Sequence, residues 1–105
     1  MAKMRLRILS WNVNGIRAIF KKGFQEWLTK DNPDILCLQE TKAQPEQLEE
    51  KIMKCNDYKS YFFSAEKKGY SGVAVYSREE PLQVNTGFNS PLFDSEGRVL
   101  EVEYE

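Results

Sequence analysis

Two strand-like stretches near the N-terminus enclose one amphipathic stretch. Residues 5–11 alternate, with Leu6 and Ile8 following arginines, and this pattern predicts a strand whose two apolar side chains point inward. Residues 34–38 are almost continuously apolar, which is typical of a strand buried on both faces. Between them, residues 16–30 repeat apolar positions at helical spacing and form one wide stripe. The pattern predicts a strand–helix–strand unit whose two strands end at the same edge of a sheet.

The remainder of the chain predicts shorter elements. Pro45 suits the first turn of a second helix, whose apolar face is narrow. Near the end of the chain, Leu100, Val102 and Tyr104 alternate with glutamates, as in a strand with one buried face. The other expected segments are strands over 58–64, 73–77 and 82–86, a hairpin-like loop over 67–72, a long loop over 87–97, and a last strand that begins at Arg98.

Length and charge narrow the class of protein. The 105 residues suffice for one small domain, and 15 basic against 16 acidic residues leave a net charge of −1. This balance argues against a basic nucleic-acid-binding tail, although a local basic patch stays open. The chain has no histidine, so the commonest general base near neutral pH is missing. The last strand reaches the final residue without a turn, and we therefore expect a chain cut from a longer protein.

We expect a cytoplasmic protein that has no membrane partner. No apolar run approaches the roughly 20 residues of a membrane span. Residues 1–7 lack the apolar core of a signal peptide. Cys37 and Cys55 fit no metal-binding spacing, and Cys37 lies in an apolar strand, where we expect a buried thiol in a reducing compartment.

Polar side chains follow both strands of the predicted unit. Asn12 and Asn14 come after the first strand, and Glu40 and Lys42 come after the second. Ligands of open α/β sheets bind at such strand ends, and carboxylate and amide oxygens are ligands of hard cations such as Mg²⁺. The residues alone leave a second interpretation open, in which Asn12 caps the helix and Glu40 pairs with Lys42 at the surface.

Basic and aromatic residues indicate a phosphate-binding surface beside these strand ends. Arg17 and Lys22 lie near the start of the predicted helix, where backbone N–H groups also favour anions. The 67–72 loop carries Gly69 and Tyr70 next to two lysines, and such a loop can follow a nucleic-acid backbone. A plain solvated surface is the alternative for that loop, and for Arg98 at the start of the last strand.

Taken together, four ordered motifs resemble the exonuclease III family of apurinic/apyrimidinic (AP) endonucleases, within the endonuclease/exonuclease/phosphatase superfamily. The motifs are LSWNVNGIRA at 9–18, PDILCLQETK at 33–42, GYSGVA at 69–74 and EGRV at 96–99. Their common order over nearly the whole chain makes the resemblance specific, and it favours the metal-site interpretation. Asn14 stands where some relatives carry an aspartate, which weakens any case for a second metal subsite.

The resemblance implies a role for each matched position. Glu40 corresponds to the principal metal-binding carboxylate, Asn12 lies beside it in the metal pocket, and Lys42 supports the metal-site network. These three form the implied catalytic set. The residues implied to contact DNA are Arg17, Ala18 through its backbone, Lys22, Gly69, Tyr70 and Arg98.

The resemblance also implies a fold and an activity. The expected fold is α/β, the N-terminal part of a deoxyribonuclease I-like four-layered sandwich with a mixed β-sheet and flanking helices, so that residues 1–105 form the first portion of a single domain. The implied activity is Mg²⁺-dependent cleavage of the DNA backbone 5′ to abasic sites, with 3′–5′ exodeoxyribonuclease activity and Mn²⁺ as an alternative ion. The implied partner is double-stranded DNA with abasic sites or 3′ ends, bound by a monomer.

Some of the family's residues have no counterpart in the chain. The catalytic tyrosine, the Asp-x-Asn motif and the C-terminal Asp-His pair are missing, so we expect activity of the full-length protein and not of these residues alone. One alternative is a non-catalytic module that binds metal or DNA. Another is a phosphoesterase of a different branch of the superfamily, such as a phosphoinositide phosphatase or a sphingomyelinase.

Overall fold

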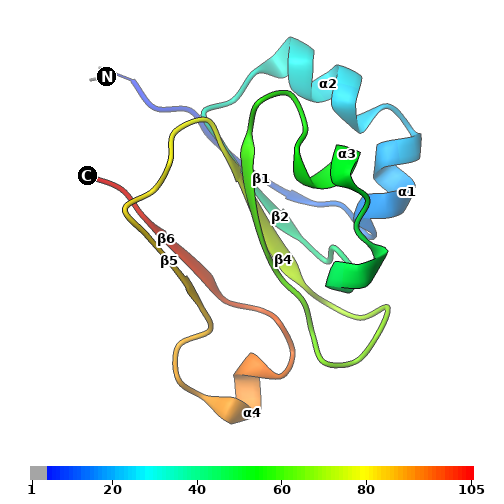
Figure 1. Ribbon diagram of the computed structural model, residues 1–105, viewed down its shortest axis with the longest axis vertical. Coiled ribbons are helices and arrows are strands. Elements are labelled where there is room, and N and C mark those ends of the chain that lie inside the picture. Colours follow the sequence, from blue (N-terminus) through cyan, green and yellow to red (C-terminus); the bar gives the residue numbers. More distant parts are fainter. Residues whose placement is uncertain (1–4) are drawn as a thin grey trace.

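A mixed four-stranded sheet organises the structure, a computed structural model that describes residues 5–105. β1 (Ile8–Asn12) and β2 (Ile35–Gln39) pair in parallel. β2 also pairs antiparallel with β4 (Val73–Ser77), and β4 pairs antiparallel with β3 (Lys59–Phe63), which gives the order β1-β2-β4-β3. The predicted strand–helix–strand unit is therefore confirmed, and both of its strands end at one edge of the sheet (Figure 1).

The helical stretch expected over 16–30 forms two helices. α1 (Ile16–Lys21) and α2 (Phe24–Asp31) are separated at Gly23, whose φ of 101° lies in the left-handed region that favours glycine. The prediction of one helix is wrong because the apolar stripe continues across the break. Side chains from both helices still reach the same core.

The second predicted helix is also interrupted. It is expected to begin at Pro45, and the structure has a 3-10 turn, η1 (Pro45–Gln47), followed by the short helix α3 (Glu50–Met53). Oε1 of Gln47 accepts a hydrogen bond from the backbone N–H of Gln44 over 2.8 Å, which closes the turn on itself. Ile52 of α3 is buried and joins the core.

The helices α1, α2 and α3 cover one face of the four-stranded sheet, and the core lies between these helices and the sheet (Figure 1). Tyr76 of β4 is its largest fully buried side chain. The Tyr76 ring contacts the rings of Phe24, Tyr58 and Phe62, and its hydroxyl donates a hydrogen bond to the carbonyl oxygen of Ile52. Burial raises the pKa of the Tyr76 phenol. This aromatic centre joins α2, α3 and the antiparallel strands.

β1 turns the opposite face toward the core from the one predicted. Leu6 and Ile8 are 55% and 56% exposed, whereas Leu9 and Trp11 pack against the core. The prediction is wrong because apolar residues occupy both phases of the alternation in this stretch. The indole of Trp11 decides the phase, since its ring centroid lies 5.9 Å from that of Phe24 on α2.

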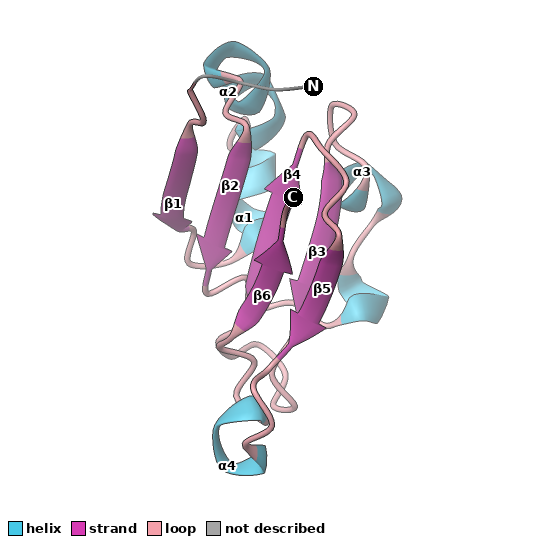
Figure 2. Ribbon diagram, turned by 90° about the vertical axis from the view of Figure 1, so that its left-hand side faces the viewer, coloured by secondary structure: helices cyan, strands magenta, loops and turns pink. Residues whose placement is uncertain are grey.

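A second sheet lies on the face of the first sheet that the helices leave open (Figure 2). β5 (Gln83–Thr86) and β6 (Leu100–Glu103) pair antiparallel to form it. The phenol of Tyr104 donates a hydrogen bond to Oγ of Ser77, which ties the end of the chain to β4. The predicted fold class, a mixed α/β sheet with flanking helices, is confirmed.

Two boundaries near the end of the chain differ from the predictions. The last strand begins at Leu100 and not at Arg98, although its alternation of partly buried and exposed side chains is as predicted. The 87–97 loop contains a short helix, α4 (Pro91–Asp94). Pro91 occupies the first turn of α4, a position that favours proline in helices generally.

Three further expectations concern membrane spans, a signal peptide and the two cysteines. Within residues 5–105, no helix is long and apolar enough to cross a membrane. The expected lack of a signal peptide rests partly on residues 1–4, which lie outside the described part. Cys55 is buried, but Cys37 is partly exposed. The expected burial of Cys37 is wrong because the second sheet lies mainly over β3 and β4 (Figure 2).

Candidate metal and phosphate site

Three segments meet at the edge of the sheet where β1 and β2 end. They are residues 12–16, 40–42 and 71–72, and backbone hydrogen bonds of 2.7–3.1 Å join them. The bonds run from the N–H of Gly15 to the carbonyl of Glu40, from Ile16 to Thr41, from Thr41 to Gly72 and from Lys42 to Ser71. The start of α1 and the end of β2 are therefore held in a fixed relation.

Glu40 and Lys42 have unusual backbone conformations. Their φ angles of 55° and 54° lie in the left-handed region, which residues other than glycine rarely adopt. Thr41 between them is buried, whereas the side chains of Glu40 and Lys42 are 43% and 37% exposed. Gly72 gives Thr41 its space, since a Cβ at this glycine would lie 2.4 Å from Oγ1 of Thr41. Such conformations cluster at functional sites, where the surrounding structure holds them in place.

Glu40 lies at the centre of a polar network. Nδ2 of Asn12 donates a hydrogen bond to Oε2 of Glu40 over 2.8 Å, and Oδ1 of Asn12 accepts the N–H of Asn14 over 3.1 Å. Nζ of Lys42 donates to Oδ1 of Asn14 and lies 3.7 Å from Oε1 of Glu40. The structure thus brings together the three residues of the implied catalytic set, Asn12, Glu40 and Lys42.

The alternative surface interpretation is correct in one part and wrong in the other. Glu40 and Lys42 do form an ion pair. Asn12, however, does not cap the helix, because Gly15 occupies the N-cap position of α1 and no side chain caps it. The Asn12 amide contacts Glu40 and the backbone of Asn14 instead, so it orients the carboxylate.

The donor set fits a hard divalent cation that keeps most of its water. Mg²⁺ often takes one or two protein ligands and completes its shell with water and phosphate oxygens. Among residues 5–105, no group of three or more histidine, cysteine or acidic side chains could hold an ion. Oε1 of Glu40 lies 3.7 Å from Nζ of Lys42, which is longer than a hydrogen bond, so this oxygen keeps lone pairs for a cation.

A basic groove of about 840 Å³ lies beside this network. Five basic side chains line it against two carboxylates, although the whole chain carries a net charge of −1. The structure brings together several residues predicted from the sequence to contact phosphates. Of the residues implied to contact DNA, the groove is lined by Arg17, Ala18, Lys22 and Gly69, and Lys42 of the polar network also lines it.

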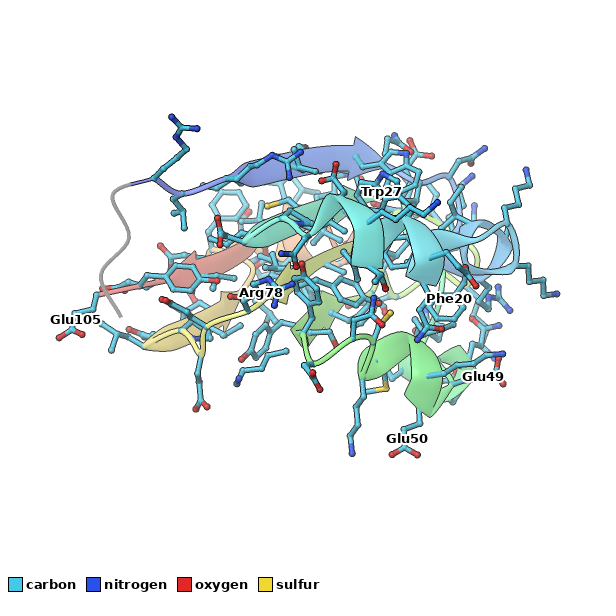
Figure 3. All side chains as sticks on the ribbon, turned by 90° about the horizontal axis from the view of Figure 1, so that it is seen from above. Phe20, Trp27, Glu49, Glu50, Arg78 and Glu105 are labelled. Carbon is cyan, nitrogen blue, oxygen red and sulfur yellow. The ribbon has the colours of Figure 1, made fainter. Side chains whose placement is uncertain are left out.

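The groove also contains residues that the sequence analysis did not single out. Phe20 of α1 and Glu49, just before α3, lie at the same end of the molecule (Figure 3) and both line the groove. Nζ of Lys51 lies 5.9 Å from the centroid of the Phe20 ring. No motif in the sequence marks Lys51, because its place in the groove depends on how α3 packs beside α1.

Tyr70 and Arg98 form a separate cluster with Glu96. The guanidinium of Arg98 donates to Oε1 of Glu96 over 2.6 Å and to the Tyr70 hydroxyl over 2.8 Å. The hydrogen bond from Arg98 lowers the pKa of the Glu96 carboxyl. The two residues predicted to contact DNA are thus brought together, and the third member is Glu96, which belongs to the EGRV motif but was assigned no DNA contact. The signal in the sequence is this motif, which carries Glu96 and Arg98 together.

Comparisons with known proteins identify relatives of the chain. The sequence profile of the endonuclease/exonuclease/phosphatase family matches residues 9–104. An exodeoxyribonuclease of Bacillus subtilis is 46% identical over 101 residues, which cover 95% of this chain and 39% of that protein. The DNA repair nuclease APEX1 of Danio rerio is 44% identical over 101 residues, which cover 94% of this chain and 33% of that protein. The chain therefore spans about two fifths or less of these two relatives.

Solved structures agree with the sequence comparisons. An AP endonuclease from Archaeoglobus fulgidus superimposes with a TM-score of 0.80 at 36% identity, over 93% of this chain and 37% of that one. A 3′–5′ exonuclease from Neisseria meningitidis superimposes with a TM-score of 0.79 at 29% identity, over 92% of this chain and 37% of that one. Both comparisons extend over nearly all of the described fold.

Proposed function

The chain belongs to the endonuclease/exonuclease/phosphatase family, and we propose that it supplies the metal-holding and phosphate-contacting part of a DNA-repair nuclease. The resemblance to the exonuclease III family of AP endonucleases is confirmed, since the chain's relatives carry exodeoxyribonuclease and AP endonuclease names. The proposed reaction is cleavage of the DNA backbone 5′ to abasic sites, with 3′–5′ exodeoxyribonuclease activity. We assign it to the whole domain, because the chain spans 39% of the Bacillus subtilis relative.

The observation that carries the proposal is the contact between Asn12 and Glu40 where two parallel strands end. Nδ2 of Asn12 lies 2.8 Å from Oε2 of Glu40 and orients this carboxylate. The carboxylate and the amide together suit Mg²⁺, with Mn²⁺ as the alternative ion. When bound there, such an ion would neutralise a phosphodiester and stabilise the leaving oxygen. Lys42, 3.7 Å from Glu40, adds a positive charge on the same side.

The basic groove supports DNA as the substrate. Arg17 of α1 and Lys22, which directly follows the helix, place positive charge on the groove, and the guanidinium of Arg17 also donates to the carbonyl of Lys42 over 3.4 Å. This bond links the groove to the metal network. Gly69 adds bare backbone at the rim, where a phosphate chain can approach closely. Preference for abasic sites or 3′ ends, a monomeric state and a cytoplasmic location remain predictions from the sequence.

A chimaera tests the proposal. The chain replaces the matched segment of the Bacillus subtilis exodeoxyribonuclease, and cleavage of a duplex with one abasic site is measured with and without Mg²⁺. We expect Mg²⁺-dependent cleavage 5′ to the abasic site by the chimaera and none by the 105-residue chain alone. Glu40→Gln in the chimaera should reduce the rate at least a hundredfold, with Glu50→Gln as the matched control on an exposed helix.

Two outcomes contradict the proposal. A chimaera that folds, as judged by circular dichroism, but cleaves neither abasic nor 3′-ended DNA would remove the nuclease assignment. Equal rates for Glu40→Gln and Glu50→Gln at saturating Mg²⁺ would remove the metal assignment. If the chain alone bound Mg²⁺ and DNA while the folded chimaera remained inactive, the non-catalytic module would be the better description.

A further inference from the structure

We propose that Glu96 is a positioning residue for DNA binding, because it holds Arg98 and Tyr70 together in one arrangement. The inference rests on the proposed function and on the DNA contacts that the resemblance implies for Arg98 and Tyr70. Glu96 itself contacts no substrate in this role. It restrains a guanidinium and a phenol that lie on two different loops and that are otherwise joined only by contacts with each other and with Lys67.

Three contacts define the arrangement. Oε1 of Glu96 accepts from Nε of Arg98 over 2.6 Å and from the Tyr70 hydroxyl over 3.4 Å, and Arg98 also donates to that hydroxyl over 2.8 Å. The guanidinium carbon of Arg98 lies 5.5 Å from the centroid of the Tyr70 ring, and Nζ of Lys67 lies 5.4 Å from it. The phenol is therefore held by hydrogen bonds at one end while two cations lie beside its ring.

The backbone keeps Glu96 in this place. Its N–H donates to the carbonyl of Phe93 over 3.0 Å, and the neighbouring Ser95 carbonyl accepts the N–H of Glu66 over 2.9 Å. Gly97 packs directly against the facing segment, where a Cβ would lie 2.5 Å from the backbone nitrogen of Ala65. The backbone that carries the Glu96 side chain is thus held against residues 64–66, the segment that leads into the loop of Tyr70.

Electrostatics distinguish positioning from a plain surface charge. An unpaired carboxylate beside a phosphate chain repels it, so its removal should strengthen DNA binding. Glu96 instead engages Nε of Arg98, which leaves N–H groups on the far side of the guanidinium for a phosphate oxygen. A glutamate carboxyl group is ionised at neutral pH, and the hydrogen bond from Arg98 lowers the pKa of Glu96 further. Its removal should therefore weaken DNA binding, which is the opposite sign.

The experiment measures binding of the 105-residue chain to a fluorescent duplex that carries a tetrahydrofuran abasic analogue, by anisotropy at several salt concentrations. We expect Glu96→Ala to weaken binding by about five- to tenfold, as for the loss of one hydrogen bond of ordinary strength. Glu96→Gln keeps an acceptor oxygen for Arg98 and should recover part of this loss. The matched control is Glu66→Ala, which removes an exposed carboxylate from the facing segment and should leave binding unchanged or slightly tighter.

The salt dependence separates positioning from a general loss of structure. If Arg98 leaves its phosphate, the slope of log K against log salt should fall by about one in Glu96→Ala, while the thermal midpoint stays within a few degrees of wild type. Wild-type or tighter binding by Glu96→Ala, when Arg98→Ala and Tyr70→Ala both weaken binding, contradicts the positioning role alone. If Arg98→Ala and Tyr70→Ala also leave binding unchanged, or the wild-type chain binds no DNA, the proposed DNA contacts fail together with this inference.

Discussion

Asn12 donates a side-chain hydrogen bond to Oε2 of Glu40 over 2.8 Å, across the ends of two parallel strands. The parallel register makes the contact possible, because it places Asn12 beside Gln39, the residue before Glu40. The left-handed backbone of Glu40 then turns its side chain out of the strand. The pair is therefore a product of sheet register and local backbone conformation together.

Glu40→Gln should remove metal binding and leave the fold intact. The amide is nearly isosteric with the carboxylate but lacks the charge that a divalent cation requires. We expect Mn²⁺-induced broadening of the amide resonances of residues 12–15 and 40–42 to disappear, with a change in stability of about 0.5 kcal/mol or less. Glu50→Gln is the control, since Glu50 lies exposed on α3 and points away from the core (Figure 3). Persistent broadening in Glu40→Gln would assign the ion to another group.

Glu40→Gly should be more stable than Glu40→Ala. Both variants lose the side chain, but only alanine keeps a Cβ at the φ of 55°. The left-handed conformation costs an L-residue about 1 kcal/mol or more relative to glycine. Urea denaturation should therefore place Glu40→Gly about 1 kcal/mol above Glu40→Ala, while neither variant binds Mn²⁺. A less stable glycine variant would show that this backbone carries little strain.

Two glycines of one loop should respond very differently to alanine. Gly72 has a φ of 90°, and a Cβ there would lie 2.4 Å from Oγ1 of the buried Thr41. Gly69 has a φ of 68°, and nothing lies within 4 Å of its added Cβ. We expect Gly72→Ala to cost more than about 2 kcal/mol through overpacking, and Gly69→Ala about 1 kcal/mol through strain alone. Equal losses in thermal denaturation would contradict the close approach at Thr41.

The contact between Glu96 and Arg98 should be lost only in acid. Arg98 lowers the pKa of Glu96 below its ordinary value of 4.5. A carboxyl group with a lowered folded-state pKa contributes stability above its unfolded pKa, and this contribution is lost as the pH falls through the folded pKa. The Nε–H resonance of Arg98 should thus stay constant from about pH 8 to pH 5 and move below that range. Glu96→Gln should abolish the transition. A transition near neutral pH in the wild-type chain would contradict this prediction.

The sheet was predictable from apolar patterns, and its details were not. The continuous apolar run over 34–38 identifies β2, because a strand buried on both faces has few alternatives. The inward face of β1 was not predictable, because its apolar residues fall in both phases and only the contact of Trp11 with α2 selects one. The break at Gly23 was missed for a related reason: the two helices share one stripe, so the pattern continues where the backbone does not.

The candidate site was predictable in membership and not in geometry. Its four polar residues lie at the ends of the two strands or within three residues after them, so strand ends and motif order were enough to gather them. The left-handed conformations of Glu40 and Lys42 leave no trace in residue type, since neither is glycine or asparagine. The place of Glu96 depends on packing between segments 64–66 and 95–97, which are far apart in the sequence.

The backbone bonds among the three segments at the strand ends also determine how the site opens. An amide that donates to another segment exchanges its hydrogen with solvent only when that segment separates. Gly15, Ile16, Thr41 and Lys42 all donate in this way, so they share one local unfolding equilibrium in place of four independent ones. Opening at Glu40 and fraying at the start of α1 are then the same event, and an ion bound at Glu40, as proposed, would slow hydrogen exchange in a helix that it does not contact.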